Sequence, residues 1–304
     1  MSGIVIAGYS EVGYRCTQWL LDAGEPVRLV YTHPDDPNET RWFESVAELA
    51  RSRGVDTLLV QDLAAPSEEA RLRAVAPEFL FSFYFRAMIP ASVLAIPSRG
   101  ALNMHGSLLP QFRGRAPVNW AILKGARETG ASLHYMTDKP DAGDLVDQEA
   151  VAIEPDDDAL VVSRKVGQAA VTVLARAWPR LKAGTAPRMP LDLAKGSYYG
   201  GRKPEDGLID WLRPAREVHD LVRAVSHPWP GAYTDLFGPK VTIWKTALSP
   251  YGGHDCFPGK VELTETSVIV YCGDDRPVEI LKARPEGRGN LDPQGFRHYV
   301  MTLK

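Results

Sequence analysis

The chain contains 304 residues, and a rough prior of about 150 residues per domain predicts two domains. Hydrophobic residues make up 44% and charged residues 24%, the balance of an ordinary globular protein that can bury a large core without disulfide staples. The formal net charge is -3. Because proteins that wrap nucleic acid usually carry a basic bias, this charge argues against DNA or RNA as the main ligand.

The cysteines and the apolar runs indicate the cellular compartment of the protein. Cys16, Cys256 and Cys272 are widely separated and include no C-x-x-C pair, so the sequence predicts three unpaired thiols rather than a disulfide scaffold or a zinc ribbon. The apolar run from Ile4 to Ala7 is too short for a signal peptide, and no later run approaches the ~18 apolar residues of a membrane span. These features predict a cytoplasmic protein with no membrane partner.

The first third of the chain alternates short apolar runs with segments of helical periodicity. Strands are predicted at 3–8, 27–31, 56–60 and 78–83, and helices at 12–23, 45–53 and 66–76. Near-continuous apolar strands that alternate with helices are typical of a parallel sheet covered on both faces. The sequence therefore predicts an α/β domain with a Rossmann-like parallel sheet and helices on both faces.

The alternation continues and then changes. Strands are predicted at 101–104, 131–136 and 149–153, with a helix at 117–124 and a long helix that begins after 156–158 and ends before Pro179. A loop rich in Gly and Pro follows, from Gly184 to Gly201. After a helix at 215–226 come short strands at 232–236, 241–244, 260–263, 267–271 and 278–281, the pattern of a small β-barrel or a partly open sheet. We therefore predict a catalytic domain at 1–190 and a smaller, OB-like β-barrel domain at 191–304.

The segment from Asn103 to Trp120 is the richest in candidate chemistry. Asn103 and His105 lie two apart at a strand end, so in extended backbone their side chains share one face. In an open α/β sheet the expected ligand crevice lies at the carboxyl ends of the strands. An amide donor beside an imidazole suits acyl transfer, because the amide can stabilise an oxyanion while the imidazole accepts a proton. The alternative is a histidine that caps a sheet edge.

Two polar loops accompany this pair. Arg113 and Arg115 flank a glycine and can orient an anionic substrate, or they can be solvated loop charges. Asp141 lies in a turn after the strand at 131–136, where its carboxylate could orient His105 and raise its basicity. Asp138, Asp144 and Asp147 are expected to be solvated turn residues. Nothing fixes three ligands at a definite spacing, so no metal site is predicted.

The combination N-x-H, S-L-L-P and D-x-G, at Asn103 to His105, Ser107 to Pro110 and Asp141 to Gly143, resembles the folate-dependent formyltransferases. The resemblance extends over essentially the whole chain and implies a Rossmann-like catalytic domain followed by a C-terminal β-barrel. It implies 10-formyltetrahydrofolate as co-substrate, no metal, and Asn103, His105 and Asp141 as the catalytic residues. The folate contacts that it implies are Ala87, Met88, Ile89, Arg115, Thr137, Asp138, Lys139 and Pro140.

Four segments are similar to the formyltransferase domain that modifies UDP-4-amino-4-deoxy-L-arabinose for lipid A and polymyxin resistance. They are 81–86, 105–120, 201–211 and 222–232. This similarity implies a sugar-nucleotide acceptor. That relative continues into an oxidative decarboxylase domain, whereas this chain stops at Lys304. The chain is then either a stand-alone enzyme or a part cut from a longer protein, and it is expected to form a homo-oligomer or to work with a separate dehydrogenase/decarboxylase partner.

Three rival activities remain open at this point. Methionyl-tRNA formyltransferases, by resemblance, carry a basic loop after the second strand, whereas the stretch from Thr32 to Arg41 is acidic here, and phosphate contacts need Lys and Arg. A formyltetrahydrofolate hydrolase would replace the amine by water. Another amino-sugar nucleotide is a further acceptor. A binding module that has lost the chemistry is disfavoured, because Asn103, His105 and Asp141 are all retained.

Overall fold

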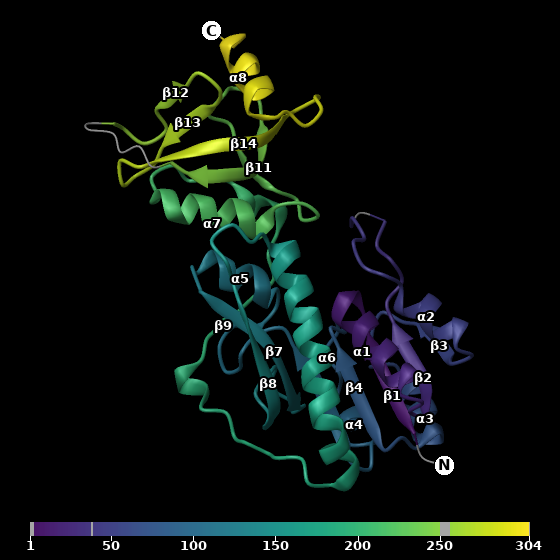
Figure 1. The fold of residues 1–304 in the computed structure, drawn as a ribbon. Coiled ribbons are helices and arrows are strands. Elements are labelled where there is room, and N and C mark those ends of the chain that lie inside the picture. Colours follow the sequence, from purple (N-terminus) through teal and green to yellow (C-terminus); the bar gives the residue numbers. More distant parts are fainter. Residues whose placement is uncertain (1–2, 38, 250–255, 304) are drawn as a thin grey trace. The chain divides into compact units, whose positions relative to one another are not determined.

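The computed structural model describes residues 3–37, 39–249 and 256–303 (Figure 1). The chain divides into two compact units, which are interleaved in sequence. The first comprises Met1–Pro117, Glu128–Ala152 and Val162–Gly200, and the second comprises Val118–Arg127, Ile153–Val161 and Gly201–Lys304. The single domain boundary at residue 190 stays a prediction.

The first unit is built on a seven-stranded sheet of order β3-β2-β1-β4-β5-β7-β8. Its strands are β1 (Ile4–Gly8), β2 (Val27–Thr32), β3 (Asp56–Leu59), β4 (Phe79–Phe83), β5 (Gly100–His105), β7 (Glu128–Tyr135) and β8 (Leu145–Ala152). Its helices are α1 (Ser10–Asp22), α2 (Val46–Ser52), α3 (Pro66–Val75), α4 (Ala91–Leu94) and α6 (Ala159–Ala183), of which α6 begins in the second unit. The neighbouring strands from β3 to β5 are parallel, which confirms the predicted α/β fold.

The last two strands of this sheet differ from the sequence expectation. β7 runs antiparallel to β5, and β8 runs antiparallel to β7. Antiparallel neighbours need only a short connection, whereas a parallel pair needs a crossover of a dozen or more residues. The loop between β7 and β8 is too short for such a crossover, so the chain turns back on itself. That turn carries Asp141.

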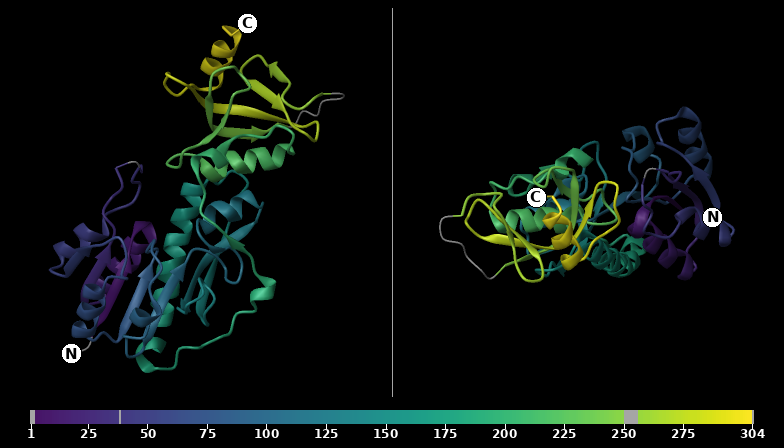
Figure 2. Two further views of the ribbon diagram at one scale, coloured as in Figure 1. Left: turned by 180° about the vertical axis from the view of Figure 1, so that it is seen from behind. Right: turned by 90° about the horizontal axis from the view of Figure 1, so that it is seen from above.

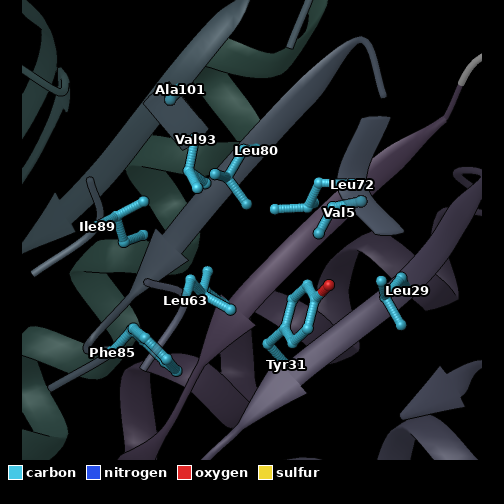
Figure 3. Close-up of a cluster of buried hydrophobic side chains, with 11 residues drawn as sticks. Val5, Leu29, Tyr31, Leu63, Leu72, Leu80, Phe85, Ile89, Val93 and Ala101 are labelled. Atoms are coloured by element: carbon cyan, nitrogen blue, oxygen red, sulfur yellow. The ribbon is translucent and has the colours of Figure 1, made fainter. Parts of the chain in front are cut away.

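Alternate residues of the strands face two separate cores. Val5, Tyr31 and Leu80 belong to a cluster shared with Leu72 of α3 and Val93 of α4 (Figure 3). The residues in between point the other way, and Phe79 and Phe81 meet the ring of Trp178 on α6 at centroid distances of 5.5 and 5.9 Å. Figure 1 shows α6 lying across the sheet beside α1. Both faces are therefore covered, as a parallel sheet requires.

The second unit contains a five-stranded antiparallel sheet of order β10-β11-β14-β13-β12. Its strands are β10 (Ala232–Thr234), β11 (Val241–Leu248), β12 (Val261–Leu263), β13 (Val268–Tyr271) and β14 (Pro277–Pro285). Helix α7 (Ala215–Val225) packs against β11 and β14, and α8 (Pro293–Met301) packs against β13 and β14 (Figure 2). This confirms the predicted C-terminal domain of short β-strands after the Gly-rich segment.

Several smaller elements complete the chain. They are α5 (Pro117–Leu123), the short strands β6 (Arg113–Gly114) and β9 (Tyr198–Tyr199), and the 3-10 turns η1 (Leu193–Lys195) and η2 (Pro204–Gly207). The prediction that the long helix ends before Pro179 is wrong. Pro179 removes one backbone N–H, but buried Trp178 and Leu181 hold the last turn in place up to Ala183. No helix among the described residues is both long and apolar enough to cross a bilayer.

Candidate active site

Strand β5 and its antiparallel neighbour β7 place the first polar side chains of the site. Asn103 and His105 end β5 on the same face, and the register sets His134 of β7 opposite Asn103. This face also carries Ala101 and the core cluster under α3 and α4. The site therefore lies on a face of the sheet as well as at a strand end.

Asp141 joins this group from the loop between β7 and β8. Its backbone has a φ of +49°, a left-handed conformation that Asp tolerates better than most residues. Its Oδ1 lies 3.2 Å from Nδ2 of Asn103 and 3.5 Å from Nδ1 of His105. The structure thus brings the three predicted catalytic residues together around one carboxylate oxygen.

The other oxygen of Asp141 is held by the backbone of β6. The N–H of Gly114 donates to Asp141 Oδ2 at 2.9 Å. Gly114 has a φ of +96°, and a Cβ there would lie 2.2 Å from the carbonyl oxygen of Tyr199 in the paired strand β9. Only glycine fits this close approach. The glycine between the two predicted arginines is thereby explained as the clamp on Asp141.

His105 is buried, with 6% of its surface exposed. Burial lowers its pKa from the usual value of 6.5, and the Asp141 carboxylate only partly opposes that shift. Its Nε2 lies 2.9 Å from the carbonyl oxygen of Phe112, which can only accept, so Nε2 carries the proton of the neutral ring. The lone pair of Nδ1 then faces Asp141. The geometry leaves Nδ1 as the proton-accepting atom.

Asp141 has the opposite electrostatic balance. Burial opposes its ionisation, but His105, His134 and the N–H of Gly114 together outweigh that cost and hold the pKa of Asp141 well below its usual range. The group is a carboxylate at neutral pH. A proton that arrives on Nδ1 of His105 would therefore form an ion pair inside the site.

His134 is the site residue that the sequence analysis missed. Its Nδ1 donates to the carbonyl oxygen of Tyr135 at 2.9 Å, so Nε2 of the neutral ring accepts from Asn103 Nδ2 at 3.2 Å. Both N–H groups of the Asn103 amide thus point at protein acceptors, His134 and Asp141. A lone histidine in a predicted strand gave no signal by itself. Its pairing with Asn103 follows only from the antiparallel register of β5 and β7.

The segments predicted to contact folate border this centre on two sides. Ala87 packs against the core cluster under α3 and α4, Met88 is exposed, and Ile89 is buried in that cluster. Met136, just before the second segment, packs against the same cluster. Thr137 to Pro140 are exposed and lead into Asp141. Of the predicted set, Ile89 is buried in the core, whereas Met88, Arg115 and Thr137 to Pro140 are exposed.

The two arginines beside Gly114 have different surroundings. The exposed side chain of Arg115 forms no hydrogen bond or ion pair with any residue that the structure describes. The guanidinium of Arg113 lies 5.9 Å from the ring centroid of Tyr198. The Arg113 side chain also has no hydrogen bond or ion pair among the described residues, and it is less exposed than that of Arg115. Within the described ranges there is no group of three or more metal-ligating side chains.

Comparison with known proteins identifies this arrangement. Residues 16–178 match the family model "Formyl transferase", and residues 202–298 match "Formyl transferase, C-terminal domain". The first match alone spans more than half of the chain. The chain belongs to the formyl transferase family. This confirms the enzyme class that the sequence predicted.

Solved structures agree at the level of the fold. The N-formyltransferase from Helicobacter canadensis, in complex with folinic acid and dTDP-3-aminofucose, superposes with a TM-score of 0.71 at 17% identity over 92% of this chain and 99% of its own. A sugar N-formyltransferase from Shewanella sp. gives a TM-score of 0.63 at 20% identity, covering 80% of this chain and 96% of its own. A variant of HypX from Aquifex aeolicus gives 0.65 at 20% identity, covering all of this formyl transferase but 48% of HypX.

Proposed function

We propose that this formyl transferase moves a formyl group from 10-formyltetrahydrofolate to the amine of a sugar nucleotide. The observation that carries the proposal is the convergence of Asn103 and His105 on the ionised carboxylate of Asp141. The solved relatives that bind folinic acid with a dTDP-sugar support both substrate classes. The finer proposal is UDP-4-amino-4-deoxy-L-arabinose as acceptor, in lipid A modification and polymyxin resistance, and it rests on the resemblance of 201–211 and 222–232.

The reaction begins with a neutral amine, because an ammonium has no lone pair with which to attack. The amine nitrogen bonds to the formyl carbon, and the formyl oxygen becomes an oxyanion. The nitrogen then gives a proton to Nδ1 of His105, which burial keeps neutral and which Asp141 faces at 3.5 Å. The resulting imidazolium is stabilised by the carboxylate. It passes the proton to N10 of the folate as the carbon–N10 bond breaks, which yields tetrahydrofolate and a formamido sugar.

The proposed role of Asn103 is to donate a hydrogen bond to the oxyanion. Since its two N–H groups point at His134 and Asp141 in this structure, one of those bonds must be exchanged when the substrate arrives. Such exchanges are common, because catalytic hydrogen bonds often tighten only in the substrate complex. His134 and Asp141 then serve to hold the amide in a usable orientation.

The folate contacts remain proposals drawn from the resemblance. Thr137, Asp138, Lys139 and Pro140 are exposed beside Asp141, and the unpaired guanidinium of Arg115 suits an anionic group of either substrate. Ala87, Met88 and Ile89 border the same face. Ile89 would contribute through its backbone.

The loop after β2 favours a sugar nucleotide over tRNA. Arg41, its only arginine, pairs with Asp35 at 3.0 Å, and Glu39 pairs with Arg86 at 2.7 Å. No lysine lies between Thr32 and Arg41, so the loop offers phosphate no unpaired cation. This surface does not resemble one that grips an acceptor stem.

The test is a transfer assay. The protein is incubated with 10-formyltetrahydrofolate and a panel of UDP- and dTDP-linked amino sugars, and mass spectrometry looks for the gain of one formyl group. We expect this gain for at least one 4-amino sugar nucleotide. Folate turnover without any amine would indicate a hydrolase instead, and a salt-sensitive shift of initiator tRNA would indicate the tRNA-modifying activity. Either result without a formylated sugar would refute the proposal.

A further inference from the structure

Tyr84 adopts an unusual backbone conformation directly beside the catalytic centre. It follows β4 with a φ of +58°, in the left-handed region that a bulky residue rarely occupies. The preceding residue, Phe83, pairs with Met104 in β5, so Tyr84 emerges next to His105. Strained backbone of this kind persists only where the surrounding structure over-determines it.

The side chain of Tyr84 lies against the residue that follows His105. A Cβ at Gly106 would lie 1.7 Å from the Tyr84 hydroxyl oxygen and 2.8 Å from its Cζ. The phenol therefore rests on the bare Cα of Gly106, where any side chain would displace it. Gly106 is needed here for close approach rather than for conformational freedom.

The hydroxyl of Tyr84 remains a neutral donor. Burial raises the pKa of Tyr84, and Cys16 and then the Asp141 carboxylate raise it further. The hydroxyl forms no hydrogen bond with any residue in the described part of the chain. Its oxygen is also absent from the set of fully buried polar atoms that lack a partner, so it is not fully buried. It is accordingly open to a ligand.

The other donors of the centre are already engaged. The two N–H groups of Asn103 point at His134 and Asp141, and Nε2 of His105 donates to the Phe112 carbonyl. The N–H of Gly114 is held by Asp141. Tyr84 alone among these groups presents a donor that needs no exchange.

We propose that Tyr84 is a further catalytic residue, whose hydroxyl donates a hydrogen bond to the formyl oxygen as negative charge develops on it. This inference rests on the proposed formyl transfer. Tyr84 and Asn103 then share the oxyanion, with the phenol oriented in advance by Gly106. Preorganised donors of this kind stabilise the transition state because they need not reorient during the reaction.

The test compares Tyr84→Phe, which keeps the ring and its packing, with Tyr31→Phe, which removes a fully buried hydroxyl from strand β2. We expect Tyr84→Phe to lower kcat by roughly 10–100-fold, with the KM for folate changed less than about threefold. Tyr31→Phe should keep the wild-type kcat. A Tyr84→Phe enzyme with kcat within about twofold of wild type, or with only a raised KM, overturns the inference.

A double-mutant cycle with Gly106→Ala separates placement of the hydroxyl from general disturbance. We expect Gly106→Ala to lower kcat strongly in the wild type and much less in Tyr84→Phe, because the hydroxyl that it would displace is then already gone. Equal losses in both backgrounds contradict the inference. A wild-type protein that formylates no amine in the panel refutes the proposed function itself, whereas an active wild type with an equally active Tyr84→Phe refutes the role of Tyr84 alone.

Discussion

Two buried histidines in the first unit share one charge state but have different surroundings. His105 ends β5 and His33 follows β2, with 6% and 9% of their surfaces exposed, and burial lowers the pKa of both. His33 uses both ring nitrogens on backbone groups: Nδ1 donates to the carbonyl of Val60 at 2.9 Å, and Nε2 accepts from the N–H of Arg86 at 3.0 Å. His105 keeps one nitrogen facing a carboxylate.

This difference separates a structural histidine from a proton acceptor. His33 stacks on Phe85 at a centroid distance of 4.2 Å and fixes the start of the segment that leads to Ala87. No carboxylate within salt-bridge distance of His33 is found among the described residues, so a proton there would be uncompensated. Burial and a lowered pKa are therefore insufficient evidence of catalysis. The facing carboxylate decides the role.

Truncation of the two histidines to alanine should give the largest difference in activity. His105→Ala should lower kcat by about 10²–10⁴, because it removes the general base. His33→Ala should lower it less than about tenfold, since it only loosens the segment after β4. Steady-state kinetics of the two purified variants test this. Comparable losses in kcat would mean that the carboxylate does not distinguish the two histidines.

The next substitution replaces the carboxylate of Asp141 by an uncharged amide of the same shape. Asp141→Asn should lower kcat by about 10–100-fold, as loss of a group that orients another commonly does. It should also lower the pKa of His105 further, because the negative charge that raises it is gone. NMR titration of the imidazole measures this, with His33 as internal reference. An unchanged His105 pKa, or a raised one, would show that Asp141 does not act on His105.

The sequence could predict the residues proposed for catalysis but not the residues that surround and orient them. Asn103, His105 and Asp141 were predictable because their residue types and spacing match a known combination. His134 was not, because its role depends on the register of β7 against β5, and antiparallel pairing there was not expected. The conformation of Tyr84 was equally out of reach, since a left-handed tyrosine leaves no mark in the sequence.

The fold shows the same limit. Strands β1 to β5 were predictable from their apolar runs, which a sheet buried on both faces requires. Helix α8 was missed, although Asp292 caps it at 2.7 Å from the N–H of Gly295 and Pro293 occupies its first turn. That signal is short and follows a loop rich in glycine. Long-range pairing, not local propensity, decided the direction of β7 and β8.

The pH dependence of activity should reveal the protonation of His105. His105 must be neutral to accept a proton, so its deprotonation should raise kcat/KM with pH through a pKa below 6.5, separately from the rise at higher pH as the amine of the substrate becomes neutral. Asp141 remains ionised throughout, because its pKa lies well below its usual range. The pH profile of kcat/KM is the measurement, because it reports the pKa values of the free enzyme. A profile without a rise centred below 6.5 would contradict the burial argument.

The smallest effect concerns stability. His33 has a folded-state pKa below its unfolded value near 6.5, so the unfolded chain binds more protons in that window. The free energy of unfolding should therefore decrease as pH falls through about 6.5 towards the folded-state pKa. His33→Phe removes this contribution and should flatten the dependence, while also costing about 1–3 kcal/mol for the orphaned Arg86 N–H. Urea unfolding at several pH values tests both; an unaltered pH dependence would count against the assignment.

The most direct test of the account is a single-turnover experiment on Asn103→Ala. The variant is loaded with 10-formyltetrahydrofolate, its Kd is measured, and formation of the formamido sugar is followed after the amino-sugar nucleotide is added. The account predicts a Kd close to that of wild type and a transfer rate lower by about 10²–10³, since an oxyanion donor acts only in the transition state. A transfer rate near that of wild type would show that the amide beside Asp141 takes no part in the reaction.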